Sequence, residues 1–320
     1  LARTEGYRNF CNKIWNAARY VLMNTEDQDC GLTDSAIEYS QADLWISSRL
    51  NQVITTTSEA IESYRFDLAS QAIYEFTWNE YCDWYLELAK ISLQSDNEAL
   101  QRGTRKTLVN VLENILRLSH PLMPFITEEI WQRVAPLAGI SADTIMLQPY
   151  PEADANQIDQ HAIDSTTWIM DFILGIRRIR GEMNIAPGKP IPVLLQNTSE
   201  ADLNFLKTSE DYLLKLGRVE SITLLEQNDE APESAISLVG EMKVLIPMAG
   251  LIDKEAEIAR LEKEINRINK DLPRVEGKLS NKKFIDKAPE EVIAKEKEKL
   301  ASMKSSLLNL EQQLVKIKAL

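Results

Sequence analysis

The side chains that most often carry out catalysis are scarce in this chain and are not arranged for it. The 320 residues include two histidines, His120 and His161, and neither has a partner at metal-ligand spacing. No Ser-His-Asp or Cys-His arrangement is recognisable, and the eleven glycines form no phosphate-binding loop. Asp83 and Glu87 lie four residues apart on one predicted helix face, but their aromatic neighbours favour a structural role. The sequence therefore predicts a chain that binds a ligand, with no catalytic residue, no metal site and no cofactor of its own.

The cysteines and the hydropathy pattern indicate a compartment. Cys11, Cys30 and Cys82 are widely spaced and odd in number, which predicts neither a disulfide framework nor a metal site. This usage is typical of the reducing cytoplasm. No apolar run approaches transmembrane length and no signal peptide is recognisable, so no membrane partner is expected. The chain begins with Leu1 and runs directly into a helical pattern, so we expect it to be part of a longer protein.

Basic side chains gather near the C-terminal end of an otherwise acidic chain. The net charge is −13, yet residues 251–320 carry sixteen Lys and Arg against thirteen Asp and Glu, a net of +3. Between residues 267 and 287 the balance is seven against three, a net of +4. Such a concentration suits contact with phosphates. Charge alone equally fits a solvated coiled-coil face of mixed sign. The candidate contacts are Arg267, Lys270, Arg274, Lys278, Lys282 and Lys283.

Two runs of apolar residues at alternating spacings of three and four predict the element that carries these cations. The pattern is the seam of a coiled coil, and Pro289 between the runs suits the first turn of a second helix. Folded back on itself, residues 251–320 form an antiparallel two-helix arm about 40 Å long. Residues 267, 270, 274 and 278 then line one stripe beside the seam, and Pro273 is expected to bend the first helix. The predicted seam pairs are Ile258 with Leu314, Ile265 with Leu307, Leu272 with Leu300, and Leu279 with Ile293.

The rest of the chain predicts a helical bundle followed by a small mixed module. Amphipathic patterns at 7–23, 41–62, 67–93, 98–118 and 126–135 predict a five-helix bundle over residues 1–145, with Trp78, Tyr81, Trp84 and Tyr85 in its core. Residues 146–250 are expected to form a helix and a small α+β module. Its predicted helices are 160–182 and 203–216, and its strands are 144–148, 191–195, 221–225, 235–239 and 243–247. The fold class is therefore mainly α.

Five segments of the chain resemble valyl-tRNA synthetases. They are residues 8–20, 43–50, 73–87, 120–131 and 176–185, of which the first resembles the helix that follows the catalytic domain. Residues 73–87 and 120–131 are shared with the leucine and isoleucine enzymes. The arm decides between them, because Lys278 to Asn281, Phe284 and Ala288 to Val292 resemble the tip of the coiled coil of the valine enzyme. The isoleucine enzyme typically ends in a cysteine zinc site, which this chain lacks.

The resemblance implies a class I aminoacyl-tRNA synthetase that attaches valine to tRNA(Val) with ATP and edits mischarged threonine. The His-Ile-Gly-His and Lys-Met-Ser-Lys-Ser signatures do not occur in these 320 residues. Catalytic and editing domains are therefore expected upstream in the same polypeptide, with ATP and Mg²⁺ bound there, in a monomeric parent enzyme. The alternatives are the same role in an isoleucine or leucine tRNA ligase, or a non-enzymatic helical scaffold protein.

The resemblance also implies which residues meet tRNA. Trp45 resembles an aromatic residue that stacks on an anticodon base, although a tryptophan packed in the bundle fits the pattern equally well. Arg49, one helical turn further on, is a candidate for a phosphate contact or for an ion pair within the bundle. Arg177 and Arg180 are candidates for the tRNA backbone, with a role at the helix C-terminus as the alternative. In the family, the arm leans on the outer corner of the L-shaped tRNA, so its cations are expected to meet phosphates and sugars there.

Overall fold

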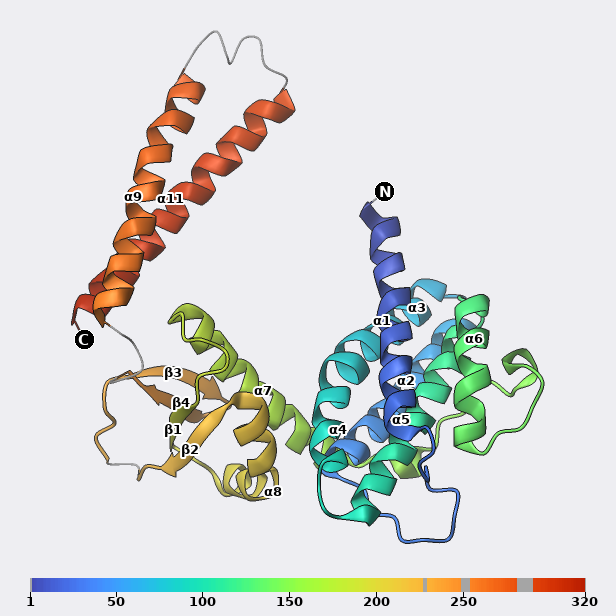
Figure 1. Cartoon of the computed structure of the whole chain (residues 1–320). Coiled ribbons are helices and arrows are strands. Elements are labelled where there is room, and N and C mark those ends of the chain that lie inside the picture. The colour runs from blue at the N-terminus through green and yellow to red at the C-terminus, as the bar shows by residue number, and fades with distance from the viewer. Residues whose placement is uncertain (1, 227–228, 249–253, 281–289, 320) are drawn as a thin grey trace. The chain divides into compact units, whose positions relative to one another are not determined.

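The computed structural model describes residues 2–226, 229–248, 254–280 and 290–319 (Figure 1). Its contacts divide the chain into two compact units, which we call the bundle unit (residues 1–174 and 198–219) and the sheet–arm unit (residues 175–197 and 220–320). The predicted fold class is confirmed, because the described chain is mainly helical with one small sheet. Among the described residues, no helix is both long and apolar enough to cross a membrane.

The bundle unit contains the five predicted helical segments. They are α1 (Ala2–Thr25), α2 (Gln41–Glu62), a continuous helical stretch made of α3 (Phe66–Glu75), the π-helix η1 (Phe76–Tyr85) and α4 (Leu86–Leu93), then α5 (Glu98–Ser119) and α6 (Pro124–Val134). Side chains fix where two of them begin. Ser40 and Asp43 form a capping box at α2, and Asn97 accepts from two backbone N–H groups at α5. Pro124 occupies the first turn of α6, where no N–H is needed.

The aromatic cluster of η1 is only partly in the core. Tyr81 and Tyr85 are fully buried, as predicted, but Trp78 and Trp84 are only half-buried. Thr77, Tyr81 and Tyr85, four residues apart, form the buried face of η1, and Trp78 and Trp84 lie beside this face. Trp78 instead stacks on Phe10 and Tyr74 near the surface. The prediction that all four aromatic residues form the core is therefore wrong for the two tryptophans.

A short strand predicted at 144–148 is absent. Residues Ile145–Leu147 form the 3₁₀-helix η3, because the Thr144 side chain accepts from the Met146 N–H and closes a turn. The same connection contains η2 (Ala135–Ala138) and η4 (Ala155–Gln157). It leads to α7 (Gln160–Glu182), which belongs to the bundle unit up to Leu174 and to the sheet–arm unit from Gly175.

The four remaining predicted strands are confirmed and form one sheet in the order β2-β1-β4-β3. They are β1 (Ile191–Gln196), β2 (Val219–Leu224), β3 (Ser234–Val239) and β4 (Met242–Pro247), and α8 (Glu200–Gly217) connects the first two. β4 pairs antiparallel with both β1 and β3, so that Leu194, Leu245 and Ile236 lie in one row. The C-terminal part of α7 lies close to β3, because a Cβ at Gly175 would be 2.6 Å from Ser237 Oγ.

The arm consists of two long helices that lie side by side, α9 (Lys254–Ser280) and α11 (Glu290–Ala319) (Figure 1). The seam residues from Ile258 to Leu279 in α9 and from Ile293 to Leu314 in α11 are buried or half-buried, whereas most of their neighbours are exposed. Leu261 and Val275 are the most enclosed of them. Pro273 lies inside α9 without ending it. The predicted tip between the helices, with Lys282, Lys283, Phe284 and Pro289, lies outside the described residues.

Candidate nucleic-acid interface

The predicted basic stripe of α9 is exposed along its whole length. Arg267, Lys270, Arg274 and Lys278 are all exposed, while the adjacent seam residues are buried or half-buried. Arg267 pairs with Glu264 of its own helix, with Nη2 and Oε2 2.9 Å apart. Lys278 Nζ lies 2.9 Å from Glu296 Oε1 of α11. The exposed pair of Arg267 is weak and can exchange one anion for another. Lys278 keeps an exposed side chain although its partner Glu296 is only 17% exposed, so both cations can still attract phosphates.

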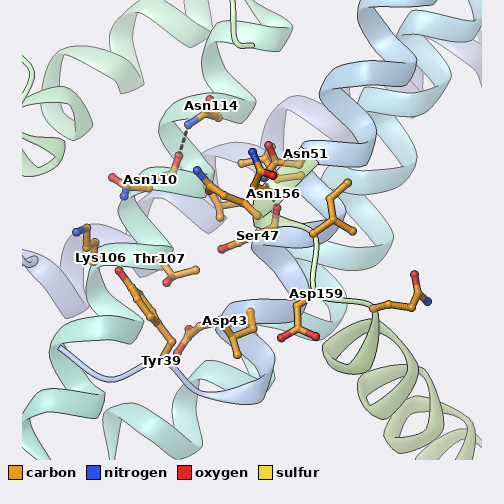
Figure 2. A pocket seen from close by; sticks show the side chains of 16 residues that line it. Tyr39, Asp43, Ser47, Asn51, Lys106, Thr107, Asn110, Asn114, Asn156 and Asp159 are labelled. Carbon is orange, nitrogen blue, oxygen red and sulfur yellow. Dashed lines mark hydrogen bonds between the residues drawn. The ribbon is translucent and has the colours of Figure 1, made fainter. Parts of the chain in front are cut away.

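A second feature lies in the bundle unit. A cleft of about 880 Å³ opens between α2, α5 and residues 156–160 (Figure 2). Its wall is rich in side chains that both donate and accept hydrogen bonds, namely Ser47, Asn51, Asn110, Asn114, Asn156 and Gln157. Tyr39 is 46% exposed, and its ring lies at the edge of the cleft beside Lys106. Together the cleft offers amide groups for the edge of a nucleobase, an aromatic face, and a cation.

The segment that carries Tyr39 is held tightly against α5. The Glu38 N–H donates to the Ala99 carbonyl at 3.0 Å, and Asn97 Nδ2 donates to the Glu38 carboxylate at 2.7 Å. Gly103 of α5 permits this approach, because a Cβ at that position would lie 1.8 Å from the Glu38 carbonyl oxygen. The position of Tyr39 therefore depends on a glycine in the middle of a helix, where glycine otherwise weakens the structure.

One wall of the cleft is attached to the core through Asp43. Its carboxylate is buried and accepts from Tyr85 Oη at 2.6 Å, from Thr104 Oγ1 at 2.9 Å and from the N–H and hydroxyl of Ser40. Burial raises the pKa of Asp43, against the opposing effect of these hydrogen bonds. The network links the start of α2 to η1 and α5, and so holds two walls of the cleft together.

The basic stripe and most of the cleft lie in segments that match known protein families. Residues 43–195 match the family model described as the anticodon-binding domain of tRNA ligase, and this range contains most of the residues that line the cleft. Residues 253–318 match the model described as the valyl tRNA synthetase tRNA binding arm, which covers the basic stripe. The chain belongs to the valyl-tRNA synthetase family. Its helical bundle and its arm are tRNA-binding domains of these ligases.

Trp45 does not fit the stacking role that the resemblance to valyl-tRNA synthetases suggested. Its side chain is 1% exposed and is among the largest fully buried residues of the bundle. A base needs an accessible ring face to stack on, so the observed position fits the alternative of a packed tryptophan. The aromatic ring that the cleft does expose belongs to Tyr39, in the loop just before α2.

Arg49 forms an ion pair within the bundle, which is the second of the two roles considered for it beside a phosphate contact. Its Nε and Nη2 donate to the two Glu80 carboxylate oxygens at 2.7 and 2.8 Å, and Nη1 donates to Gln52. This two-pronged geometry is the strong form of the arginine–carboxylate interaction. Because the pair joins α2 to η1, its structural role is clear, and a phosphate would have to displace Glu80.

The structure separates Arg177 and Arg180, which sequence spacing placed on one face. Arg177 is exposed on α7, whereas Arg180 is 6% exposed. Arg180 Nη1 donates to the carbonyls of Ala186 and Lys189 at 3.1 and 2.7 Å, and burial lowers the pKa of its guanidinium. Arg180 thus closes the loop that follows the C-terminus of α7, and of these two arginines only Arg177 has an exposed side chain.

Sequence reasoning missed the amide-lined cleft, although a signal for it is present. Lys106, Asn110 and Asn114 recur every four residues in α5, a helix whose other positions are largely buried. A polar stripe of this length on a buried helix indicates a face that opens to solvent or to a ligand. Tyr39 has no such periodicity, because its position depends on the contact between its loop and Gly103.

Proposed function

We propose that this chain is the tRNA-holding part of an enzyme that attaches valine to tRNA(Val). The arm supports this most directly, since its exposed basic stripe lies in the segment that matches the tRNA-binding arm of valyl-tRNA synthetases. In this proposal the catalytic and editing domains lie upstream in the same polypeptide. ATP and Mg²⁺ bind there, and the present residues need no cofactor.

The bundle cleft is proposed to receive one base of the anticodon loop. Proteins read single-stranded RNA by stacking unstacked bases on aromatic rings and by hydrogen bonding to their edges. Tyr39 supplies the ring, and Asn110, Asn114 and Asn156 supply donors and acceptors around one opening (Figure 2). Lys106 adds a positive charge next to Tyr39, which suits a neighbouring phosphate. Asn114 already donates to the Asn110 carbonyl and accepts from Arg117, and Asn156 donates to Asp154, so a base would replace these contacts or use the remaining capacity of the amides.

The arm is proposed to hold the RNA backbone at the outer corner of the tRNA. Arg267, Lys270, Arg274 and Lys278 lie one turn apart in sequence, which matches contact with phosphates and carries no base-edge readout. Lys282 and Lys283 have the same charge and remain part of the proposal. Arg177 also remains a candidate for backbone contact, because its side chain is exposed on α7.

The experiment is a binding titration with a tRNA(Val) transcript at several salt concentrations. The variant K270A/R274A/K278A should bind more weakly, and its salt dependence should flatten by about one unit of slope or less for each phosphate that the arm no longer neutralises. A matched control is K297A/K304A, which also removes positive charge from the arm. Lys304 pairs with Glu276, and Lys297 lies one heptad before it, so both follow seam positions and lie on the opposite flank.

Three results would reject the proposal. Equal affinity and salt slope in the triple variant and the parent would remove the arm from tRNA binding. Equal loss in the triple and control variants would indicate a non-specific charge effect. The third result is that the parent binds tRNA(Val) and a tRNA with an unrelated anticodon with equal affinity, and that Tyr39→Ala leaves both affinities unchanged. This result would argue against base reading in the cleft.

A further inference from the structure

One position of the arm seam is occupied by an acid. The seam of α11 steps alternately by three and four residues, and the position that falls between Ile293 and Leu300 is Glu296. Its side chain is 17% exposed, so it lies at the interface of the two helices and not on the outer surface. Val275, which the predicted register places in the same layer, is buried. The carboxylate therefore interrupts an otherwise apolar row.

One cation of α9 contacts this carboxylate, and two further cations act on it through their charge. Lys278 Nζ donates to Glu296 Oε1 at 2.9 Å. This hydrogen bond is the largest cause of the lowered pKa of Glu296, and the charges of Lys278, Lys299 and Arg274 act in the same direction. Glu296 Oε2 is buried and accepts no hydrogen bond from the residues that the structure describes. Lys278 thus pairs with the acid directly, while Arg274 of the stripe and Lys299, which precedes the seam residue Leu300 in α11, act on it through their charge.

Glu296 is a poor choice if the only requirement is a stable arm. A charge in the seam costs desolvation, and an apolar side chain of similar size usually gives equal or higher stability. A polar seam residue does, however, favour the one register in which its partner is within reach. A shift of α9 by one heptad along α11 would move Lys278 away from Oε1 and, in one direction, bring Asp271 into its place.

We propose that Glu296 is a positioning residue for RNA binding: it draws Arg274 and Lys278 of α9 and Lys299 of α11 onto one flank of the arm and fixes the register that keeps them there. This inference rests on the proposed role of the arm in holding RNA. Three cations and one carboxylate leave the site net positive, so phosphates remain attracted to it. Lys299 thereby joins the RNA-facing residues, although it lies on the second helix, outside the stripe predicted from the sequence.

The opposite flank provides a comparison within the same arm. Glu276 and Lys304 also form an ion pair between the two helices, with Oε1 and Nζ 2.8 Å apart. Both side chains are more exposed than Glu296, and Glu276 follows a seam position without occupying one. Glu276→Gln therefore removes the same negative charge and one interhelical pair without changing the seam.

The test measures tRNA(Val) affinity and arm stability in Glu296→Gln, Glu296→Leu and the control Glu276→Gln. Simple electrostatics predicts tighter RNA binding whenever an acid is removed. The positioning role predicts the reverse, namely that both Glu296 variants bind up to about fivefold more weakly, the scale of one exposed ion pair. Glu296→Leu should do so although it raises the thermal unfolding midpoint of the arm. Glu276→Gln should match or exceed the affinity of the parent.

Two outcomes separate this inference from the function on which it rests. If Arg274→Ala and Lys278→Ala weaken binding but both Glu296 variants bind as tightly as the parent or more tightly, the positioning role is rejected and the phosphate-binding role stands. If Arg274→Ala and Lys278→Ala have no effect, the phosphate-binding role itself fails. Lys299→Ala provides an independent check, because unchanged affinity in that variant would remove α11 from the RNA-binding surface.

Discussion

The substitution Gly103→Ala should destabilise the bundle and close the cleft, although it places a better helix former inside α5. The new Cβ would lie 1.8 Å from the Glu38 carbonyl oxygen, whereas ordinary contact begins at 3.4 Å. The segment before α2 must therefore move by about 1.6 Å, the difference between these distances, because the clash is with the backbone and not with the end of a flexible side chain. Such a shift strains the hydrogen bond from the Glu38 N–H to the Ala99 carbonyl.

The expected change follows from three contributions. Forcing extra atoms into a filled space costs about 1–3 kcal/mol. Loss of one backbone hydrogen bond costs about 1 kcal/mol. The gain from alanine over glycine in a helix offsets about 0.5–1 kcal/mol. The free energy of unfolding of the bundle should therefore fall by about 2 kcal/mol on these magnitudes.

Urea unfolding followed by tryptophan fluorescence measures this change, and a titration with tRNA(Val) measures its effect on binding. The control is Gly181→Ala near the end of α7, where nothing lies within 4 Å of the new Cβ. That variant should be neutral or slightly more stable and should bind tRNA as the parent does. If Gly103→Ala unfolds at the same urea concentration as Gly181→Ala, the close approach of Glu38 to α5 does not hold Tyr39 in place, and the argument for the cleft fails.

Three further predictions concern the core, the long loop and the arm. Trp45→Phe should lower the unfolding free energy through poorer packing by about 1–3 kcal/mol, yet leave tRNA affinity unchanged once the protein is folded; a large loss of affinity in a folded variant would restore the stacking role. The pKa of Asp29 is lowered to about 2, first by the Thr33 hydroxyl and also by nearby N–H groups and Arg102. The stability that Asp29 contributes is therefore present above its ordinary pKa near 4 and is lost as the pH falls from about 4 to 2. Hydrogen exchange of the Gly31 amide should report that loss, and Asp29→Asn should abolish the pH dependence. Deletion of residues 251–320 from the proposed full-length ligase should weaken tRNA binding and charging while valine activation by ATP continues, and impaired activation would contradict a purely RNA-holding arm.

The sequence predicted most of the fold because periodicity is a local signal. The alternation of three and four residues in 251–320 identified both arm helices, and four of the five strands expected in the mixed module were correct. The errors arose where a side chain competed with the pattern. Thr144 closes a 3₁₀ turn in place of the expected strand, and Trp78 and Trp84 lie beside the buried face of η1 and not on it.

The candidate site was harder to predict because it depends on contacts between distant segments. The exposure of the stripe from Arg267 to Lys278 follows from helix geometry alone. The buried orientation of Trp45 does not follow from helix geometry alone, because amphipathic spacing does not determine whether a tryptophan at a helix start points inward. Tyr39 reaches the cleft only because its loop lies on Gly103, more than sixty residues later, and no local pattern encodes that meeting.

The buried Asp43 network has a consequence for how quickly a ligand can enter the cleft. Asp43 ties Ser40 at the start of α2 to Thr104 in α5 and Tyr85 in η1 through hydrogen bonds that lie wholly within the protein. The walls are therefore preorganised, and an incoming base does not have to wait for a loop to close or a helix to shift. Entry should behave as a single encounter step whose rate rises in proportion to RNA concentration, with no plateau from a preceding rearrangement of the protein.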